Sequence, residues 1–212
     1  MGDFLYSRAL SDLVRLGDME PLAVFTYASN ALTLGEMRQL AALDALAFSE
    51  DDYDTLIESK TASLFAAACE VGSLCGAQRY RRALTRFGQR LGMAFQVADD
   101  LLDYTEAQET TGKPTGLDLR EHKVTLPLIY ALESDGAAGK RLVRTVLEEK
   151  GFDSVRPEQI TALVHESGAL DRTRAAAQDF AARAKACLNG NGKSDYGRAL
   201  RTVPDFILER DN

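Results

Sequence analysis

Apolar residues recur along the chain with the period of an α-helix. From Asp3 to Leu16 the residues Leu5, Ala9 and Leu13 fall on one stripe, and the polar side chains lie largely off it. No alternating strand pattern, domain linker or internal repeat is visible, so we expect residues 1–212 to form one all-α domain. The same period predicts further helices over residues 20–47, 77–106, 124–134, 137–150, 157–168, 169–188 and 196–209.

Another helix is predicted to begin after Ser49, because Ser49 followed by acids in the first turn is typical of a capping box. It carries Lys60 and Thr61 at the entry to a run of small residues and ends at a turn over 72–76. A lysine at a buried position needs an anionic partner, so we expect the aspartates described below or an anionic ligand to pair with Lys60. Glu36 and Gln39 are expected to form structural pairs.

Composition excludes several classes of function. The net charge of −7 argues against a general nucleic-acid binder, and no apolar run has the length of a membrane span. The residues after Met1 are not typical of a signal peptide. Cys69, Cys75 and Cys187 are expected to be small buried residues in a reducing compartment. We therefore expect a cytoplasmic protein.

Three aspartates stand near the end of the predicted 77–106 helix. Asp99 and Asp103 are four residues apart and share a helical face, and Asp100 lies about 100° round the helix. Hard oxygen ligands with no nearby His or Cys suit Mg²⁺. Taken alone, however, such a motif also fits a solvated acidic face.

The segment that follows favours the metal interpretation. Residues 110–123 are rich in Gly, Pro and Thr and carry Lys113 and Lys123, so they are predicted to form a loop. Glycines let backbone N–H groups approach a phosphate, and lysines neutralise its oxygens as point charges. Carboxylates followed by a Gly-Lys loop are suited to a diphosphate–Mg²⁺ site.

Several ordered motifs resemble those of the trans-isoprenyl diphosphate synthases, also called polyprenyl synthetases, and especially the long-chain type that makes octaprenyl diphosphate. The resemblance spans nearly the whole chain. The motifs are GDFLYSRA (2–9), KTA (60–62), FQVADDLLD (95–103), GKP (112–114) and KVTLP (123–127).

The resemblance implies an all-α isoprenoid synthase bundle around a central cavity. It implies an enzyme that condenses an allylic diphosphate with isopentenyl diphosphate and uses Mg²⁺. In this chain the metal ligands would be Asp99, Asp100 and Asp103. The allylic diphosphate would be held by Lys60, Lys113 and Lys123, with Thr61 and Gln96 lining the same region as catalytic residues together with Lys60.

One departure from the family pattern is large. The family's first aspartate-rich motif, and the Gly-Lys-Arg segment before it, would lie upstream of Met1. We therefore expect the C-terminal two-thirds of the usual bundle, little activity from this chain alone, and a homodimer or a partner subunit that covers exposed apolar faces. The alternative is a non-catalytic or regulatory subunit of a prenyltransferase. A class I terpene cyclase is disfavoured, because cyclases carry the DDxxD motif early and lack the Gly-Lys-Pro loop.

Overall fold

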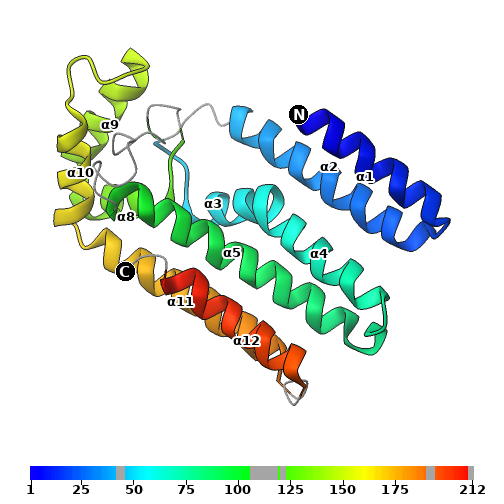
Figure 1. The fold of residues 1–212 in the computed structure, drawn as a ribbon. Coiled ribbons are helices and arrows are strands. Elements are labelled where there is room, and N and C mark those ends of the chain that lie inside the picture. Colours follow the sequence, from blue (N-terminus) through cyan, green and yellow to red (C-terminus); the bar gives the residue numbers. More distant parts are fainter. Residues whose placement is uncertain (42–45, 106–118, 120–122, 190–193, 210–212) are drawn as a thin grey trace.

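The computed structural model describes residues 1–41, 46–105, 119, 123–189 and 194–209 (Figure 1). Their regular structure is helical, with no strand in these ranges, so the expected all-α fold is confirmed for the described part of the chain. The elements are α1 (Gly2–Leu16), α2 (Met19–Ala41), α3 (Glu50–Ile57), the π-helical segment η1 (Glu58–Ala62), α4 (Ser63–Leu74), the 3₁₀ turn η2 (Gln78–Tyr80), α5 (Arg81–Thr105), α8 (Leu126–Asp135), α9 (Ala137–Glu149), α10 (Pro157–Glu166), α11 (Ala169–Cys187) and α12 (Asp195–Leu208).

Helix α5 is the centre of the bundle. It packs against α4 on one side and α11 on the other, as Figure 1 shows. Its buried residues recur every three or four positions, among them Phe87, Leu91, Ala94, Ala98 and Leu101. Since this stripe faces the other helices, the amphipathic pattern of the sequence accounts for the position of α5.

Helix α8 lies near the carboxyl end of α5, beside α9 and α10 (Figure 1). Every residue from Leu126 to Leu132 is buried, including Pro127 in the first turn. A helix that is apolar on all sides must be covered on all sides, so α8 anchors this end of the bundle. The residues just before it, Val124 and Thr125, are thereby held close to α5 and α3.

Several predicted helix boundaries differ from the structure, and three of the differences lie near α4 and α5 or at the end of α2. The helix expected to reach Ala47 has ended by Leu46, since Leu46 and Ala47 form a turn and a bend. The turn expected from Gly72 begins later, because α4 continues to Leu74 and the chain turns at Gly76, where φ is +132°. Glycine tolerates that angle, whereas Gly72 is compatible with a helix. The helix expected from residue 77 begins at residue 81, after η2.

The predicted capping box at Ser49 is confirmed. The Ser49 hydroxyl accepts the Asp52 backbone N–H at 3.2 Å, and the Asp52 carboxylate accepts the Ser49 backbone N–H at 3.1 Å. These bonds hold the pKa of the Asp52 carboxyl below its usual range. The cap therefore accounts for the acidic run at the start of α3 without a metal.

The helix that starts at Ser49 changes character where Lys60 and Thr61 lie. Residues Glu58–Ala62 form a π-helical segment between α3 and α4, which the sequence pattern did not predict. A π-bulge changes the rotation between residues and is often found at functional sites. Here it lies between α3 and α4, so the side chains of α4 are rotated relative to those of α3.

Glycines of two neighbouring helices allow close approach to this segment. A Cβ added to Gly92 of α5 would lie 2.6 Å from the Ala62 Cα, and one added to Gly35 of α2 would lie 3.0 Å from the Lys60 backbone nitrogen. The backbones of α2 and α5 therefore contact η1 from different directions. This contact fixes the positions from which the Lys60 and Thr61 side chains project.

Apolar side chains on α1 and α2 are exposed. No residue of α1 is buried, and Phe4, Val14, Leu16, Tyr27 and Met37 are each more than half exposed. Contiguous exposed apolar residues are typical of an interaction surface. None of the described helices has both the length and the apolar composition needed to cross a membrane.

The three cysteines are free thiols. Cys69 and Cys187 are partly buried, but Cys75 is exposed at the end of α4. The expectation that all three are buried is therefore wrong, because the chain turns toward solvent at Cys75. Burial raises the pKa of the Cys69 thiol.

Candidate active site

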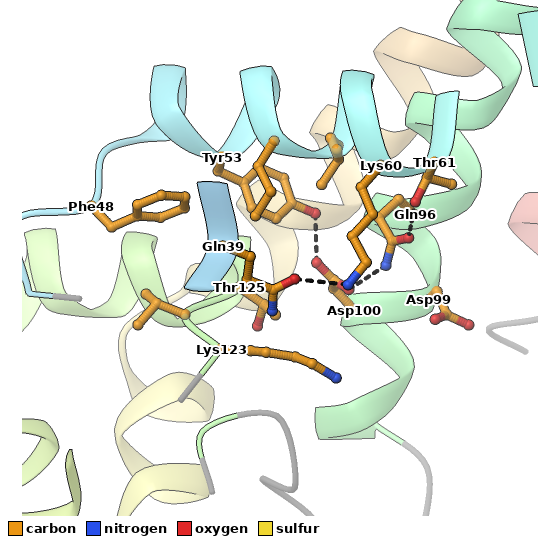
Figure 2. Close-up of a pocket in the computed structure, with 13 residues that line it drawn as sticks. Gln39, Phe48, Tyr53, Lys60, Thr61, Gln96, Asp99, Asp100, Lys123 and Thr125 are labelled. Carbon is orange, nitrogen blue, oxygen red and sulfur yellow. Dashed lines mark hydrogen bonds between the residues drawn. The ribbon is translucent and has the colours of Figure 1, made fainter. Parts of the chain in front are cut away.

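A pocket of about 150 Å³ opens where α2, α3, η1 and α5 meet the segment before α8 (Figure 2). Pockets that enclose a whole drug-sized ligand span about 300–1,000 Å³. This pocket is therefore of a size for the polar end of a substrate. Its lining consists of Gln39, Phe48, Tyr53, Leu56, Ile57, Lys60, Thr61, Gln96, Asp99, Asp100, Lys123, Val124 and Thr125.

The structure brings together six of the eight residues predicted for the site. Lys60 and Thr61 come from η1, Gln96, Asp99 and Asp100 from α5, and Lys123 from the segment before α8; all line the pocket. Asp103 lies one turn further along α5, on the same helical face as Asp99. Lys113 lies outside the described residues.

Asp99 and Asp100 differ sharply in environment. Asp99 is exposed, whereas Asp100 is only 5 % exposed and both of its carboxylate oxygens accept hydrogen bonds from protein groups. The Tyr53 hydroxyl donates to Oδ2 at 2.6 Å, and the Gln96 amide donates to Oδ1 at 2.8 Å. Asp100 is therefore held by the protein, whereas Asp99 faces solvent at the pocket.

A chain of hydrogen bonds continues from Asp100 to η1. The Thr61 hydroxyl donates to the Gln96 Oε1 at 2.7 Å, so Gln96 connects Thr61 to Asp100 (Figure 2). All of these side chains are buried or half-buried. Buried polar groups with satisfied hydrogen bonds are rigid, so this wall of the pocket is preorganised.

Lys60 is paired with α2. Its Nζ donates to the Gln39 Oε1 at 2.7 Å and lies 3.1 Å from the Glu36 Oε1. The expectation that the aspartates neutralise Lys60 is therefore wrong, and the structural pairing expected of Glu36 and Gln39 is confirmed. The physical reason is the close approach of α2 at Gly35, which brings its polar face to η1.

The donor set has the chemistry of a site for a hard divalent cation. Asp99 and Asp103 offer carboxylate oxygens from one face of α5, the ligand type that Mg²⁺ prefers. Within the ranges that the structure describes, no group of three or more His, Cys, Asp or Glu side chains is placed to hold a metal. These residues therefore fit one side of a magnesium–diphosphate site, with the remaining ligands supplied by phosphate, water or other carboxylates.

Seven of the thirteen lining residues were not predicted to lie in the site, and two of them, Tyr53 and Gln39, form hydrogen bonds with predicted site residues. Tyr53 lies 47 residues before its partner Asp100, and the π-helical segment Glu58–Ala62, which carries Thr61, shifts the helical register between Tyr53 and Thr61. Gln39 was assigned a structural pair, which it forms, but it also lines the pocket. The position of Tyr53 two turns before Thr61, on an apolar face of a predicted helix, was the one available signal.

Comparison with known proteins shows the family of the chain. The model of the polyprenyl synthetase family matches residues 1–164 of the 212-residue chain. The chain belongs to the polyprenyl synthetase family. The predicted resemblance is thereby confirmed.

Among curated polyprenyl synthetases, the chain is 38 % identical to an all-trans-nonaprenyl-diphosphate synthase (geranyl-diphosphate specific) of Rhodobacter capsulatus, over 99 % of this chain and 64 % of that protein. It is 35 % identical to the octaprenyl diphosphate synthase of Escherichia coli, over 100 % of this chain and 66 % of that protein. The chain thus spans slightly less than two thirds of the length of these relatives.

Solved structures of the family have the same fold. A polyprenyl synthase from Caulobacter crescentus, solved in complex with calcium and isoprenyl diphosphate, superposes with a TM-score of 0.91 at 38 % identity, covering 100 % of this chain and 65 % of that one. A decaprenyl diphosphate synthase from Rhodobacter capsulatus superposes with a TM-score of 0.89 at 35 % identity, covering 100 % and 66 %. The all-α isoprenoid synthase fold is therefore shown for this polyprenyl synthetase chain.

Proposed function

We propose that this chain carries the allylic-diphosphate half of a trans-polyprenyl diphosphate synthase site. The reaction joins an allylic diphosphate to isopentenyl diphosphate and releases diphosphate. The observation that carries the proposal is the pocket in which Lys60, Thr61, Gln96, Asp99 and Lys123 come together from three separate segments. The Caulobacter relative, solved with a divalent cation and isoprenyl diphosphate, supports the same assignment.

The charges of the pocket suit a diphosphate. Lys60 and Lys123 line it from opposite walls, and we propose that Lys113 joins them in holding the leaving diphosphate. Breaking the allylic C–O bond places negative charge on that group, and positive side chains aimed at it stabilise the transition state. Thr61 and Gln96 present polar atoms at the neighbouring wall, where they line the allylic end of the substrate.

We propose Mg²⁺ as the cofactor, held by the carboxylates of Asp99 and Asp103. Bound there, it would neutralise charge that develops on the diphosphate oxygens. Asp100 was predicted as a third ligand, but both of its oxygens accept hydrogen bonds from Tyr53 and Gln96, which supports a positioning role instead.

We expect the chain alone to have little or no condensing activity. It spans about two thirds of its relatives, and the described residues offer one aspartate pair, whereas the family uses two opposed aspartate clusters. The exposed apolar side chains of α1 and α2 support a homodimer or a partner subunit. We propose that the protein acts in the cytoplasm.

A second candidate function is a component of a synthase made of different chains. A heptaprenyl diphosphate synthase component 2 of Geobacillus stearothermophilus is 30 % identical over 99 % of this chain. The name of that relative favours this candidate. The pocket lined by lysines and Asp99 favours a component that binds substrate over a purely regulatory one.

The test is incorporation of radiolabelled isopentenyl diphosphate, with farnesyl diphosphate and Mg²⁺. We expect the purified chain to incorporate almost no label. A chimera that adds the unmatched part of the Rhodobacter capsulatus relative ahead of Met1 should incorporate label only with Mg²⁺. The matched control is the same chimera with Asp99→Asn, which should be inactive.

Two results would overturn the proposal in different ways. Robust incorporation by the chain alone would contradict the incomplete site. A chimera that is folded by circular dichroism yet inactive, and that binds no allylic diphosphate, would contradict the assignment of the pocket.

A further inference from the structure

The two neighbouring aspartates at the pocket have separate tasks. Consecutive residues of a helix are about 100° apart, so Asp99 and Asp100 cannot face the same point. Asp99 is exposed at the pocket, and Asp100 is turned toward α3, where its Oδ2 accepts the Tyr53 hydroxyl at 2.6 Å. This is the length of a charge-assisted O–H···O⁻ bond, which is stronger than a neutral one.

The chemistry of the carboxylate sets the direction of every bond in the chain. A carboxylate only accepts hydrogen bonds, so the nitrogen of the Gln96 amide must face Asp100, where it lies 2.8 Å from Oδ1. The amide oxygen must then face Thr61. The Thr61 hydroxyl donates its only proton to that oxygen at 2.7 Å, so Thr61 can only accept a hydrogen bond from any further group.

We infer that Asp100 is a positioning residue rather than a metal ligand: together with Tyr53 it orients Gln96 and Thr61, so that Thr61 presents an acceptor to the pocket. The inference rests on the proposed function for the identity of the ligand. It assigns a role to Tyr53, which lies two turns before Thr61.

The acceptor complements the lysines. Lys60 and Lys123 line the same pocket with positive charge, which suits the diphosphate end of an allylic substrate. An oxygen lone pair suits the carbon end, which becomes electron-poor as the C–O bond breaks. If Thr61 were turned to donate its proton into the pocket, the partial positive charge of that proton would face the electron-poor carbon and repel it. Asp100 therefore fixes the polarity of one wall without touching the substrate.

The test compares four variants of the chain. Asp100→Asn introduces an amide that can donate, so Gln96 is free to turn. Tyr53→Phe keeps the ring but removes the donor. Asp99→Asn removes the proposed metal ligand. Tyr130→Phe removes a buried tyrosine hydroxyl that bonds Glu50, away from the pocket. It is the matched control for the loss of a phenol.

The first measurement follows the side-chain amide of Gln96 in protein labelled with [¹⁵N]glutamine. In the unmodified chain its protons should exchange slowly with solvent. Asp100→Asn and Tyr53→Phe should move its resonances and speed that exchange about tenfold or more, which corresponds to the loss of one hydrogen bond. Asp99→Asn and Tyr130→Phe should leave both unchanged.

The second measurement is the affinity for Mn²⁺, a substitute for Mg²⁺, in the presence of an unreactive allylic thiolodiphosphate. Asp99→Asn should weaken it by at least about tenfold, since even the loss of an outer-shell partner costs that much. Asp100→Asn and Tyr53→Phe should change it by less than about threefold, below that range. A metal-ligand role for Asp100 would not separate the two measurements in this way.

The inference is overturned if Asp100→Asn weakens Mn²⁺ binding as much as Asp99→Asn does, or if the Gln96 amide is unaffected by both Asp100→Asn and Tyr53→Phe. If Asp100→Asn does not fold, Tyr53→Phe decides by the same criteria. If the unmodified chain binds neither Mn²⁺ nor the thiolodiphosphate, the proposed function fails, and the Gln96 measurement still tests the orienting bonds.

Discussion

Two buried tyrosines of this protein each donate a hydrogen bond to a carboxylate, and they do so in different surroundings. Tyr53 donates to Asp100 at 2.6 Å, and Tyr130 donates to Glu50 at 2.7 Å. Both rings are at most 3 % exposed. The local chemistry is the same, so the neighbours decide what each pair does.

The first pair is linked by further hydrogen bonds to side chains that line the pocket. Asp100 is buried and accepts a hydrogen bond from Gln96, which in turn accepts one from Thr61. The second pair contacts the partly exposed side chain of Arg172. The Arg172 guanidinium stacks 3.6 Å from the centre of the Tyr130 ring and pairs with Glu50 at 3.3 Å, linking α3, α8 and α11. A tyrosine–carboxylate bond thus supports a binding wall in one place and joins helices in the other.

The largest expected effect sharpens this contrast. Asp99→Ala should weaken Mg²⁺-dependent binding of an allylic thiolodiphosphate at least about a hundredfold, since a divalent cation contributes several kcal/mol at such a site. The midpoint of thermal unfolding should change little, because Asp99 is exposed. Calorimetric titration measures the first and circular dichroism the second. Glu133→Gln is the control and should bind normally, because Glu133 pairs with Arg172 beside the Tyr130–Glu50 pair. If Asp99→Ala binds as tightly as the unmodified chain, Asp99 is not part of the site.

The next effect concerns the packing beneath the pocket. Gly92→Ala places a methyl group 2.6 Å from the Ala62 Cα, which should cost about 1–3 kcal/mol of the free energy of unfolding and weaken diphosphate binding. The control is Gly72→Ala, which meets no atom within 4 Å and should stabilise α4 by up to about 1 kcal/mol. Urea denaturation measures both. Equal stabilities for the two variants would mean that α5 does not constrain η1.

A smaller effect is expected from the second tyrosine. Tyr130→Phe should lower the free energy of unfolding by about 1 kcal/mol at neutral pH and leave diphosphate binding intact. Burial and the carboxylate of Glu50 raise the pKa of the Tyr130 phenol. Above pH of about 10 the unfolded chain loses this proton first, so the unmodified protein should lose stability with rising pH more steeply than the variant.

Urea denaturation across the alkaline range measures that difference. Parallel pH profiles for the unmodified protein and Tyr130→Phe would show that Tyr130 titrates as it does in the unfolded chain. Weakened diphosphate binding in the same variant would show that the Tyr130–Glu50 pair also supports the pocket, as the Tyr53–Asp100 pair does.

The smallest effect concerns Lys60. Glu36→Gln removes its 3.1 Å ion pair, whose partners are roughly a third and a half exposed. Partly exposed pairs contribute about 0–1 kcal/mol, so freeing Lys60 should strengthen diphosphate binding by no more than about fivefold. Arg38→Gln changes a charge on the same helix as a control. A loss of affinity in Glu36→Gln would mean that Glu36 positions Lys60 for the diphosphate instead of competing for it.

Much of the fold was predictable, because helical periodicity and caps are local. The stripe along α5 and the capping box at Ser49 both have their signal within a few residues. The π-helical segment was not, and the backbones of α2 and α5, which are remote in sequence, contact it at Lys60 and Ala62. Local patterns do not record such contacts.

The same limit applies to the site. The motifs identified six of the residues that line the pocket, yet the family resemblance gave Asp99 and Asp100 the same role as metal ligands. Their difference depends on Tyr53, which is remote in sequence and carries no motif of its own. The partner of Lys60 was missed for the same reason, because Glu36 and Gln39 come from a separate helix.

The most direct test of the whole account is a crystal structure of the chain with Mn²⁺ and an allylic thiolodiphosphate. We expect an anomalous manganese peak beside Asp99, diphosphate oxygens within reach of Lys60 and Lys123, and Asp100 still bonded to Tyr53 and Gln96. A manganese ion on Asp100, or a diphosphate bound outside this pocket, would contradict it.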